Sequence, residues 1–244
     1  MTDVKQFFKS QGPKLLPFFV FVIIYFAFVR DPVGELWTTL LKCAPIVCLM
    51  LYIVLNGINL TKDSKYSLSI LLGLIFSCGG DALLNMDLFP HGMGSFALAQ
   101  ICYIIAFGFK PLKLLIAVPL YLAGAAFVAI VYKDLDDVLV VGLPVYVTLL
   151  LTMCWRSLAR AVDRKCFLAI FCAVGSVFFV ISDGLIAVDM FLIKVPNARI
   201  WIMTTYYLAQ FAIALSTANE LAKKKSPKNF KGRNNSARRH VKSN

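Results

Sequence analysis

Histidine and charged side chains are scarce in this chain of 244 residues. It contains only 2 histidines, and charged residues make up 16% of the sequence, against about a quarter in an average soluble domain. A hydrolytic zinc site needs several histidine ligands, so this scarcity argues against zinc hydrolases. The 7 cysteines include no Cys-x-x-Cys pair. The sequence therefore indicates no metal site and no other cofactor.

Long apolar segments take the place of the missing charge. The composition is 59% hydrophobic, and the mean hydropathy is +0.77. Most of the apolar segments approach the roughly 17–25 residues that a helix needs to cross the hydrocarbon core. They do not show the alternation of membrane β-strands. The sequence thus predicts an all-α, polytopic transmembrane bundle of about eight spans, at about 15–30, 37–55, 66–86, 94–109, 112–132, 138–157, 167–189 and 198–221.

The net charge of +12 is distributed unevenly among the loops. Counted along the chain, 20 basic residues fall at the N-terminus or after every second span, and 4 fall in the opposite loops. The positive-inside rule therefore predicts that both termini are cytoplasmic. Topology and anionic lipid head groups explain the basic charge, so nucleic acid is not needed as a partner. We expect 1–222 to form the membrane domain and 223–244 to be a disordered basic tail.

Three ionisable side chains lie inside the expected spans: Lys42, Asp81 and Asp183. Each costs about 2.5–3.5 kcal/mol on the insertion scale, so each should face a partner or a wet cavity. From the expected helix ends, all three should lie at one depth with Gln100. Further hydrogen-bonding side chains are expected about one turn deeper, among them Tyr103 and Tyr206.

The two aspartates give the sharpest functional hypothesis. At one depth they should repel when both are ionised, so one would tend to hold its proton while Lys42 neutralises the other. Such a pair supplies the acid and the base needed to add water across an acid-labile bond. The residues also suit a proton-coupled transporter, because a weak similarity around Asp81 and Asp183 suggests a 4+4 parallel repeat. A third reading is that the aspartates only tie helices together.

Several motifs taken together resemble the lysoplasmalogenase (YhhN-type) family, and within it the vertebrate transmembrane 86 group, the A-type more than the B-type. The motifs are LLKCAPI at 40–46, FSCGGDALL at 76–84, FPHGM at 89–93, FFVISDGLIA at 178–187 and MTTYYLAQ at 203–210. The resemblance covers 15–221 and implies an eight-span hydrolase, mainly of the endoplasmic reticulum. Such an enzyme cleaves the vinyl ether bond of lysoplasmenyl-ethanolamine or lysoplasmenyl-choline, giving a fatty aldehyde and a glycerophospho-base without a metal.

The resemblance also implies roles for particular residues. The paired acids of the family match Asp81 and Asp183, the expected catalytic residues, and its second-span lysine matches Lys42. Relatives often carry histidine where this chain has Gln100, and glutamine can hydrogen-bond but cannot shuttle a proton. Five residues are expected to contact the lysophospholipid: Lys42, Gln100, Tyr103, Tyr206 and Gln210. The alternatives to a hydrolase are a proton-coupled transporter and a catalytically silent lipid-binding protein.

Overall fold

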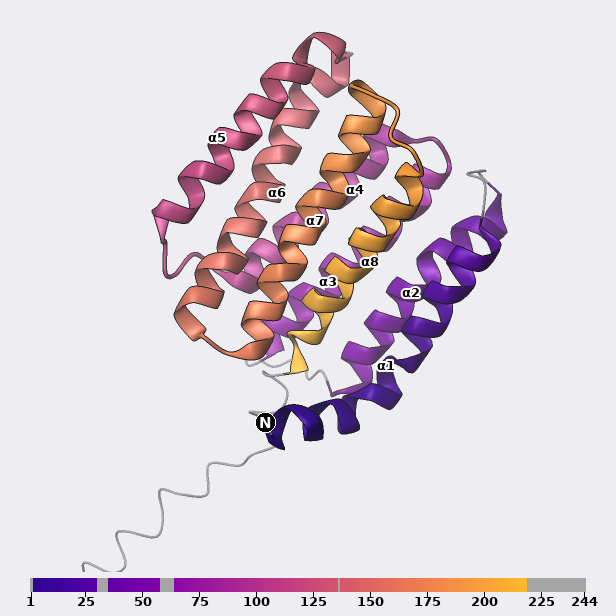
Figure 1. The fold of residues 1–244 in the computed structure, drawn as a ribbon, viewed down its shortest axis with the longest axis vertical. Helices are drawn as coiled ribbons and strands as arrows, with labels where there is room; N and C mark the ends of the chain where they lie inside the picture. The colour runs from indigo at the N-terminus through magenta and orange to yellow at the C-terminus, as the bar shows by residue number, and fades with distance from the viewer. Residues whose placement is uncertain (1, 30–34, 58–63, 136, 219–244) are drawn as a thin grey trace, which may run out of the picture.

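The computed structural model describes residues 2–29, 35–57, 64–135 and 137–218 (Figure 1). Within these ranges all regular structure is helical and no strand occurs. The expected all-helical bundle is therefore confirmed, whereas the expected tail at 223–244 lies outside the described residues. The described helices are α1 (Thr2–Phe28), α2 (Leu36–Leu55), α3 (Lys65–Asn85), α4 (Phe89–Phe107), α5 (Leu114–Val131), the short 3-10 helix η2 (Tyr132–Asp134), α6 (Asp137–Arg164), α7 (Phe167–Phe191) and α8 (Ala198–Leu215).

Some helices begin or end away from the expected positions. Helix α1 begins at Thr2 instead of 15, and Figure 1 shows that its first part crosses one end of the bundle before the helix turns to run beside α2. Pro13 and Pro17 lie inside α1, and proline bends a helix because it removes a backbone donor and its ring clashes with the preceding turn. Helix α4 begins at Phe89 instead of 94, with Pro90 in its first turn, where the missing N–H costs nothing.

Six of the described helices are long and apolar enough to cross a membrane: α1, α2, α3, α5, α6 and α7. The other two, α4 and α8, have 19 and 18 residues, which is still span length. Polar side chains such as Gln100, Tyr103 and Gln210 make them less apolar. These side chains are buried against other helices, so protein instead of lipid surrounds them.

Small residues let the inner helices approach closely. A Cβ on Gly80 of α3 would lie 2.7 Å from the ring of Phe96 on α4. A Cβ on Gly175 of α7 would lie 2.5 Å from the Cβ of Ala212 on α8. Glycine therefore permits the two most extensive helix contacts, α3 with α4 and α7 with α8. Helix α5 lies at one edge of the bundle against α6, and α1 lies at the other edge (Figure 1).

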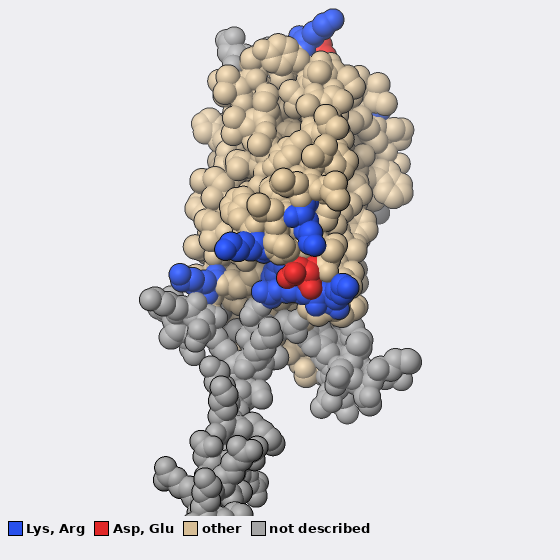
Figure 2. Space-filling model, turned by 90° about the vertical axis from the view of Figure 1, so that its left-hand side faces the viewer, with Lys and Arg blue, Asp and Glu red and all other residues tan. Residues whose placement is uncertain are grey.

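Basic side chains gather toward one end of the molecule. Figure 2 shows this on the face nearest α5, where most of the surface carries neither Lys, Arg, Asp nor Glu. The α4–α5 and α6–α7 connections contribute Lys110, Lys113 and Lys165. Near them the buried Arg156 donates to the carbonyl oxygens of Gly108 at 2.5 Å and Pro111 at 2.7 Å, which fixes the α4–α5 connection.

Candidate active site

Asp81 lies in a buried polar cluster formed by α2, α3 and α8. It is 2% exposed, its Oδ1 lies 3.4 Å from Nζ of Lys42, and its Oδ2 accepts a hydrogen bond from the hydroxyl of Tyr206 at 2.5 Å. Nζ of Lys42 also donates to the carbonyl oxygen of Asp81 at 3.3 Å. The hydroxyl of Tyr207 donates to the carbonyl oxygen of Lys42 at 2.9 Å. The lysine and the carboxylate thus offset each other's charge inside the bundle.

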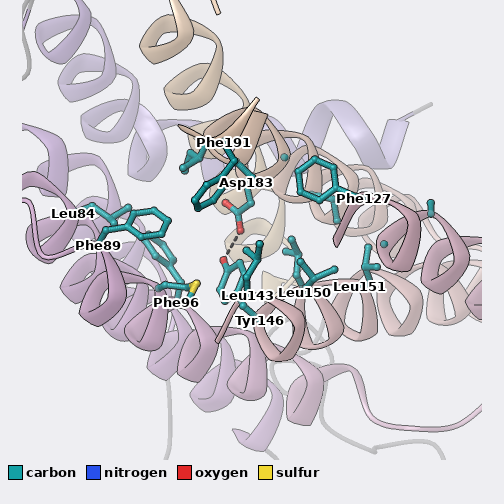
Figure 3. Close-up of a pocket in the computed structure, with 18 residues that line it drawn as sticks. Leu84, Phe89, Phe96, Phe127, Leu143, Tyr146, Leu150, Leu151, Asp183 and Phe191 are labelled. Carbon is teal, nitrogen blue, oxygen red and sulfur yellow. Dashed lines mark hydrogen bonds between the residues drawn. The ribbon is translucent and has the colours of Figure 1, made fainter. Parts of the chain in front are cut away.

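Asp183 on α7 has a different environment. Its Oδ2 accepts a hydrogen bond from the hydroxyl of Tyr146 on α6, and no ion pair to Asp183 occurs among the described residues. Both side chains line a cavity of about 250 Å³ between α4, α5, α6 and α7. Figure 3 shows the two polar groups pointing toward each other, with aromatic and aliphatic side chains around them. Apart from Asp183 and Tyr146, the described lining is apolar, including Leu84, Phe89, Phe96, Phe127, Leu143, Leu150, Leu151 and Phe191.

A third polar group lies deeper, between α4 and α8. The hydroxyl of Tyr103 donates to Oε1 of Gln210 at 2.8 Å and lies 3.4 Å from Oγ of Ser77. Gln100 lies one turn from Tyr103 on α4 and is fully buried. Its side chain lies beside Tyr146, and that of Gln210 lies beside Tyr206. This group therefore adjoins the tyrosines that hold the two aspartates.

Three aromatic rings lie at the boundary between the Asp81 cluster and the cavity. The ring of Tyr206 lies 6.0 Å from that of Phe96 and 5.8 Å from that of Phe179, and the two phenylalanine rings are 6.3 Å apart. All three contacts are edge-to-face, the geometry that the ring quadrupoles favour. Phe96 also lines the cavity of Asp183, so its ring contacts Tyr206 on one side and the cavity on the other.

The polar groups form a column instead of the single layer expected from the sequence. Asp81 is four residues from the end of α3, which corresponds to about 6 Å along the helix. Asp183 is eight residues from the end of α7, or about 12 Å. Gln100 is eleven residues from the start of α4, or about 16 Å, because α4 begins earlier than expected. Of the expected residues, Lys42, Asp81 and Tyr206 meet in one cluster, and Tyr103 and Gln210 meet in another.

Tyr146 is the site residue that sequence reasoning missed. It lies two residues after Pro144 in a span that is otherwise apolar at this point. A single tyrosine in such a span reads as a packing or interfacial residue, so no motif distinguishes it. Its helical spacing from Leu143 and Leu150 would have placed all three on one face, which in the structure is the face that lines the cavity.

Metal ligands are not clustered in the described part of the chain. No group of three or more His, Cys, Asp or Glu side chains there could hold a metal ion. No disulfide joins the cysteines in the described part of the chain, and three of them are buried. The three polar groups described above supply carboxyl, ammonium, hydroxyl and amide groups.

Comparison with known proteins points to one family. The family model described as YhhN matches residues 37–217, a range that contains every side chain of the three polar groups. Lysoplasmalogenase TMEM86A from Bos taurus is 36% identical over 217 residues, covering 85% of this chain and 90% of that protein. Lysoplasmalogenase TMEM86A from Homo sapiens is 36% identical over 216 residues with the same coverage. Lysoplasmalogenase TMEM86B from Homo sapiens is 31% identical over 204 residues, covering 83% of this chain and 85% of that protein. No solved structure gives a significant match.

Proposed function

Because the chain belongs to the YhhN family, we propose that it is a lysoplasmalogenase that hydrolyses the vinyl ether bond of lysoplasmenyl-ethanolamine or lysoplasmenyl-choline. The products would be a fatty aldehyde and a glycerophospho-base. The observation that carries the proposal is Asp183, held by Tyr146 on the wall of an apolar cavity. A cavity of this kind binds an alkyl chain, and its few polar groups orient the reacting atoms.

The chemistry of a vinyl ether explains why carboxyl groups suffice. Protonation of the β-carbon gives an oxocarbenium ion, which water captures as a hemiacetal. The hemiacetal then collapses to an aldehyde and an alcohol. A glycosidase solves a similar problem, with one carboxylic acid that delivers a proton and one carboxylate that stabilises the cation.

Asp183 is the proton donor in this mechanism. It has no cationic partner among the described residues, and an unpaired carboxylate against an apolar wall is costly. The neutral acid avoids that cost and can protonate a vinyl ether bound in the cavity. Tyr146 fixes the side chain by its hydrogen bond, so the carboxyl group stays directed at one position.

Asp81 is the ionised partner. Lys42 lies 3.4 Å from its carboxylate and offsets the cost of burying the charge. A carboxylate in the cluster beside the cavity can lower the energy of an oxocarbenium ion formed there. Tyr206, which already donates to Asp81, can pass on a proton released during water addition. Lys42 and Tyr206 therefore act through Asp81, and the three expected contacts Gln100, Tyr103 and Gln210 lie deeper.

Two observations favour an enzyme over a proton-coupled transporter. Helices α2, α5 and α6 continue without a break through Pro45, Pro119 and Pro144, whereas many carriers build ion sites from interrupted helices. Asp81 pairs with a lysine and Asp183 does not, so the two halves offer unlike sites. An alternating-access carrier with matched halves does not require that asymmetry.

We place the protein in the endoplasmic reticulum membrane with both termini in the cytoplasm, as part of the same proposal. The bias of basic residues toward the end with Lys110, Lys113 and Lys165 supports this orientation (Figure 2). The lining residues Phe89, at the start of α4, and Phe191, at the end of α7, then lie toward the lumenal side.

The direct test uses purified protein and lysoplasmenyl-ethanolamine. We expect fatty aldehyde and glycerophosphoethanolamine in equal amounts. The matched control substrate is the saturated alkyl ether lysolipid, which has no double bond to protonate and should give neither product. A folded protein that binds the vinyl ether lipid but releases no aldehyde would refute the hydrolase and favour the lipid-binding alternative.

A further inference from the structure

A groove separate from the Asp183 cavity lies on the outer surface of the bundle, between α6 and α7. Its volume is about 590 Å³, and its described lining shares no residue with the cavity. Helix α6 contributes side chains such as Ala161 and Val162, the α6–α7 connection contributes Lys165, and α7 contributes side chains between Ile170 and Phe178. The hydrolysis proposed above uses none of these residues, so the groove has no part in it.

Alanine at the floor and valine at the rim shape this groove. Ala161 and Ala173 are 8% and 3% exposed, whereas the valines that follow them, Val162 and Val174, are 50% and 46% exposed. The lining positions of each helix recur at the three- and four-residue spacing that places side chains on one face. An apolar channel with branched side chains along its edges fits a flexible alkyl chain by van der Waals contact.

The groove has the length of one membrane leaflet. From Ile170 to Phe178 its apolar lining extends eight residues along α7, or about 12 Å. One leaflet contributes about 15 Å of hydrocarbon, half of the roughly 30 Å core. Lys165 lies beyond the apolar part of the lining, at the end of the bundle where basic side chains gather (Figure 2). The groove therefore places an ammonium where a lipid has its head group and apolar walls where it has its chains.

The charge at the head of the groove is positive. Lys165 is exposed, and no ion pair within the described part of the chain includes it. The neighbouring Asp163 and Arg164 formally offset each other. Arg160, one turn earlier on α6, lies over the ring of Tyr66 at 3.9 Å and so is directed toward α3. An anionic head group is attracted by the remaining charge, whereas a zwitterionic head group brings a cation of its own.

We propose that the α6–α7 groove binds an anionic diacyl phospholipid, with one acyl chain along the groove and the anionic head group at Lys165. In the orientation proposed above, this end faces the cytoplasm, and the cytoplasmic leaflet carries the anionic lipids. One basic side chain near the surface favours an anionic lipid by about fivefold. A second copy of the chain fits less well, because a symmetric contact joins the two grooves and the described lining has no acidic side chain for Lys165.

Native mass spectrometry of the full-length chain in detergent micelles measures this binding. The probes are dioleoyl phosphatidylserine and dioleoyl phosphatidylcholine, which share their acyl chains and differ in net charge. We expect the first phosphatidylserine to bind with a Kd about fivefold lower than that of the first phosphatidylcholine. The unfolding temperature should rise more with phosphatidylserine, because a ligand that binds the folded chain stabilises it in proportion to its affinity.

Two variants separate the charge from the groove. Lys165→Gln should abolish the fivefold preference and leave the Kd for phosphatidylcholine unchanged, because glutamine removes only the charge. Val174→Trp should narrow the groove at its rim and weaken the binding of both lipids by about tenfold. Lys113→Gln is the matched control for charge, and Leu122→Trp, at a side chain that is 66% exposed on α5, is the control for bulk. Neither control residue lines the groove, so both variants should bind as the wild type does.

Three results would overturn this inference. Equal Kd values of the wild type for the two lipids would show that no anionic site exists. A preference that survives Lys165→Gln, or that Lys113→Gln removes equally, would show that the basic end as a whole attracts the lipid. A wild-type dimer in micelles that Val174→Trp converts to a monomer would assign the groove to a second copy of the chain.

Discussion

Replacing Asp183 by asparagine tests the acid role with little change in shape. Asparagine has nearly the same size, and its Oδ1 can still accept the hydrogen bond from Tyr146. It cannot give a proton to the vinyl ether. The change therefore removes the chemistry and keeps the packing of the cavity wall (Figure 3).

The expected loss follows from the surroundings of Asp183. A general acid contributes about 10²–10⁴-fold to turnover. No other carboxyl group, Asp81 included, lines the cavity within the described residues. No nearby group can thus replace the missing acid, and we expect a loss near 10⁴-fold, which is about 5.4 kcal/mol of transition-state stabilisation. The free energy of unfolding should fall by only about 1–3 kcal/mol, the cost of one imperfectly paired amide.

The assay measures aldehyde release from saturating lysoplasmenyl-ethanolamine by Asp183→Asn, with lysolipid binding and thermal unfolding measured on the same preparation. Asp189→Asn is the matched control, because Asp189 is on the same helix but does not line the cavity. Its Oδ2 lies 3.6 Å from Nζ of Lys194, and its Oδ1 accepts a hydrogen bond from the backbone N–H of Val195 at 2.8 Å, which asparagine can still accept. This control variant should keep the wild-type rate. Combining Asp183→Asn with Asp81→Asn should be hardly worse than the worse single variant, because residues that act as a unit are not additive.

Near-normal turnover by folded, lipid-binding Asp183→Asn would refute the reasoning. The hydrogen bond to Tyr146 would then serve only to join α6 to α7. A transporter or a lipid-binding protein would then explain the site better than a hydrolase does.

Four further predictions test the site and its setting. Lys42→Met should destabilise the fold by about 3 kcal/mol in thermal unfolding, because it leaves its carboxylate partner buried and unpaired; unchanged stability would contradict the ion pair. Gly184→Phe should fill the cavity and lower kcat/KM by about tenfold or more, whereas Gly94→Phe, outside the cavity lining, should not; equal rates would contradict the cavity as the lipid site. Glycosylation acceptors near Asp136 should be modified and acceptors in 223–244 should not, and the reverse pattern would overturn the topology. Strong chelators should leave aldehyde release intact, and loss restored by zinc would contradict carboxyl catalysis.

Much of the fold follows from the sequence because each membrane-crossing helix must be compatible with lipid by its own length and composition. A helix that crosses the hydrocarbon core must be long and apolar, and no other segment of the chain is needed to recognise it. The helices α2, α3 and α7 therefore lie within two residues of the expected ranges. Some helices extend beyond the expected spans, such as α1 at its start and α6 at its end. The additional residues include polar ones, which a hydropathy criterion leaves out of a span although they can still form a helix.

The principal charged site residues were also visible in the sequence. Lys42, Asp81 and Asp183 are conspicuous because charge is expensive inside a span, so each signals a partner or a function. Tyr146 and Gln100 are not conspicuous in the same way. A tyrosine or a glutamine costs little free energy in a buried helix and often serves packing alone. Composition therefore could not reveal that Tyr146 donates to Asp183 or that Gln100 lies beside Tyr146.

The sequence by itself determined the helices, the charge bias along the chain and the presence of buried ionisable groups. Only the tertiary structure decided their partners: Asp81 meets Lys42 and Tyr206, whereas Asp183 meets Tyr146 and faces a cavity. The physical reason lies in how these helices associate. Spans that are apolar on nearly every side carry no stripe to show which face turns inward. Rotation is instead set by close packing at small residues, as where Gly80 admits the ring of Phe96, and that packing depends on residues distant in the chain.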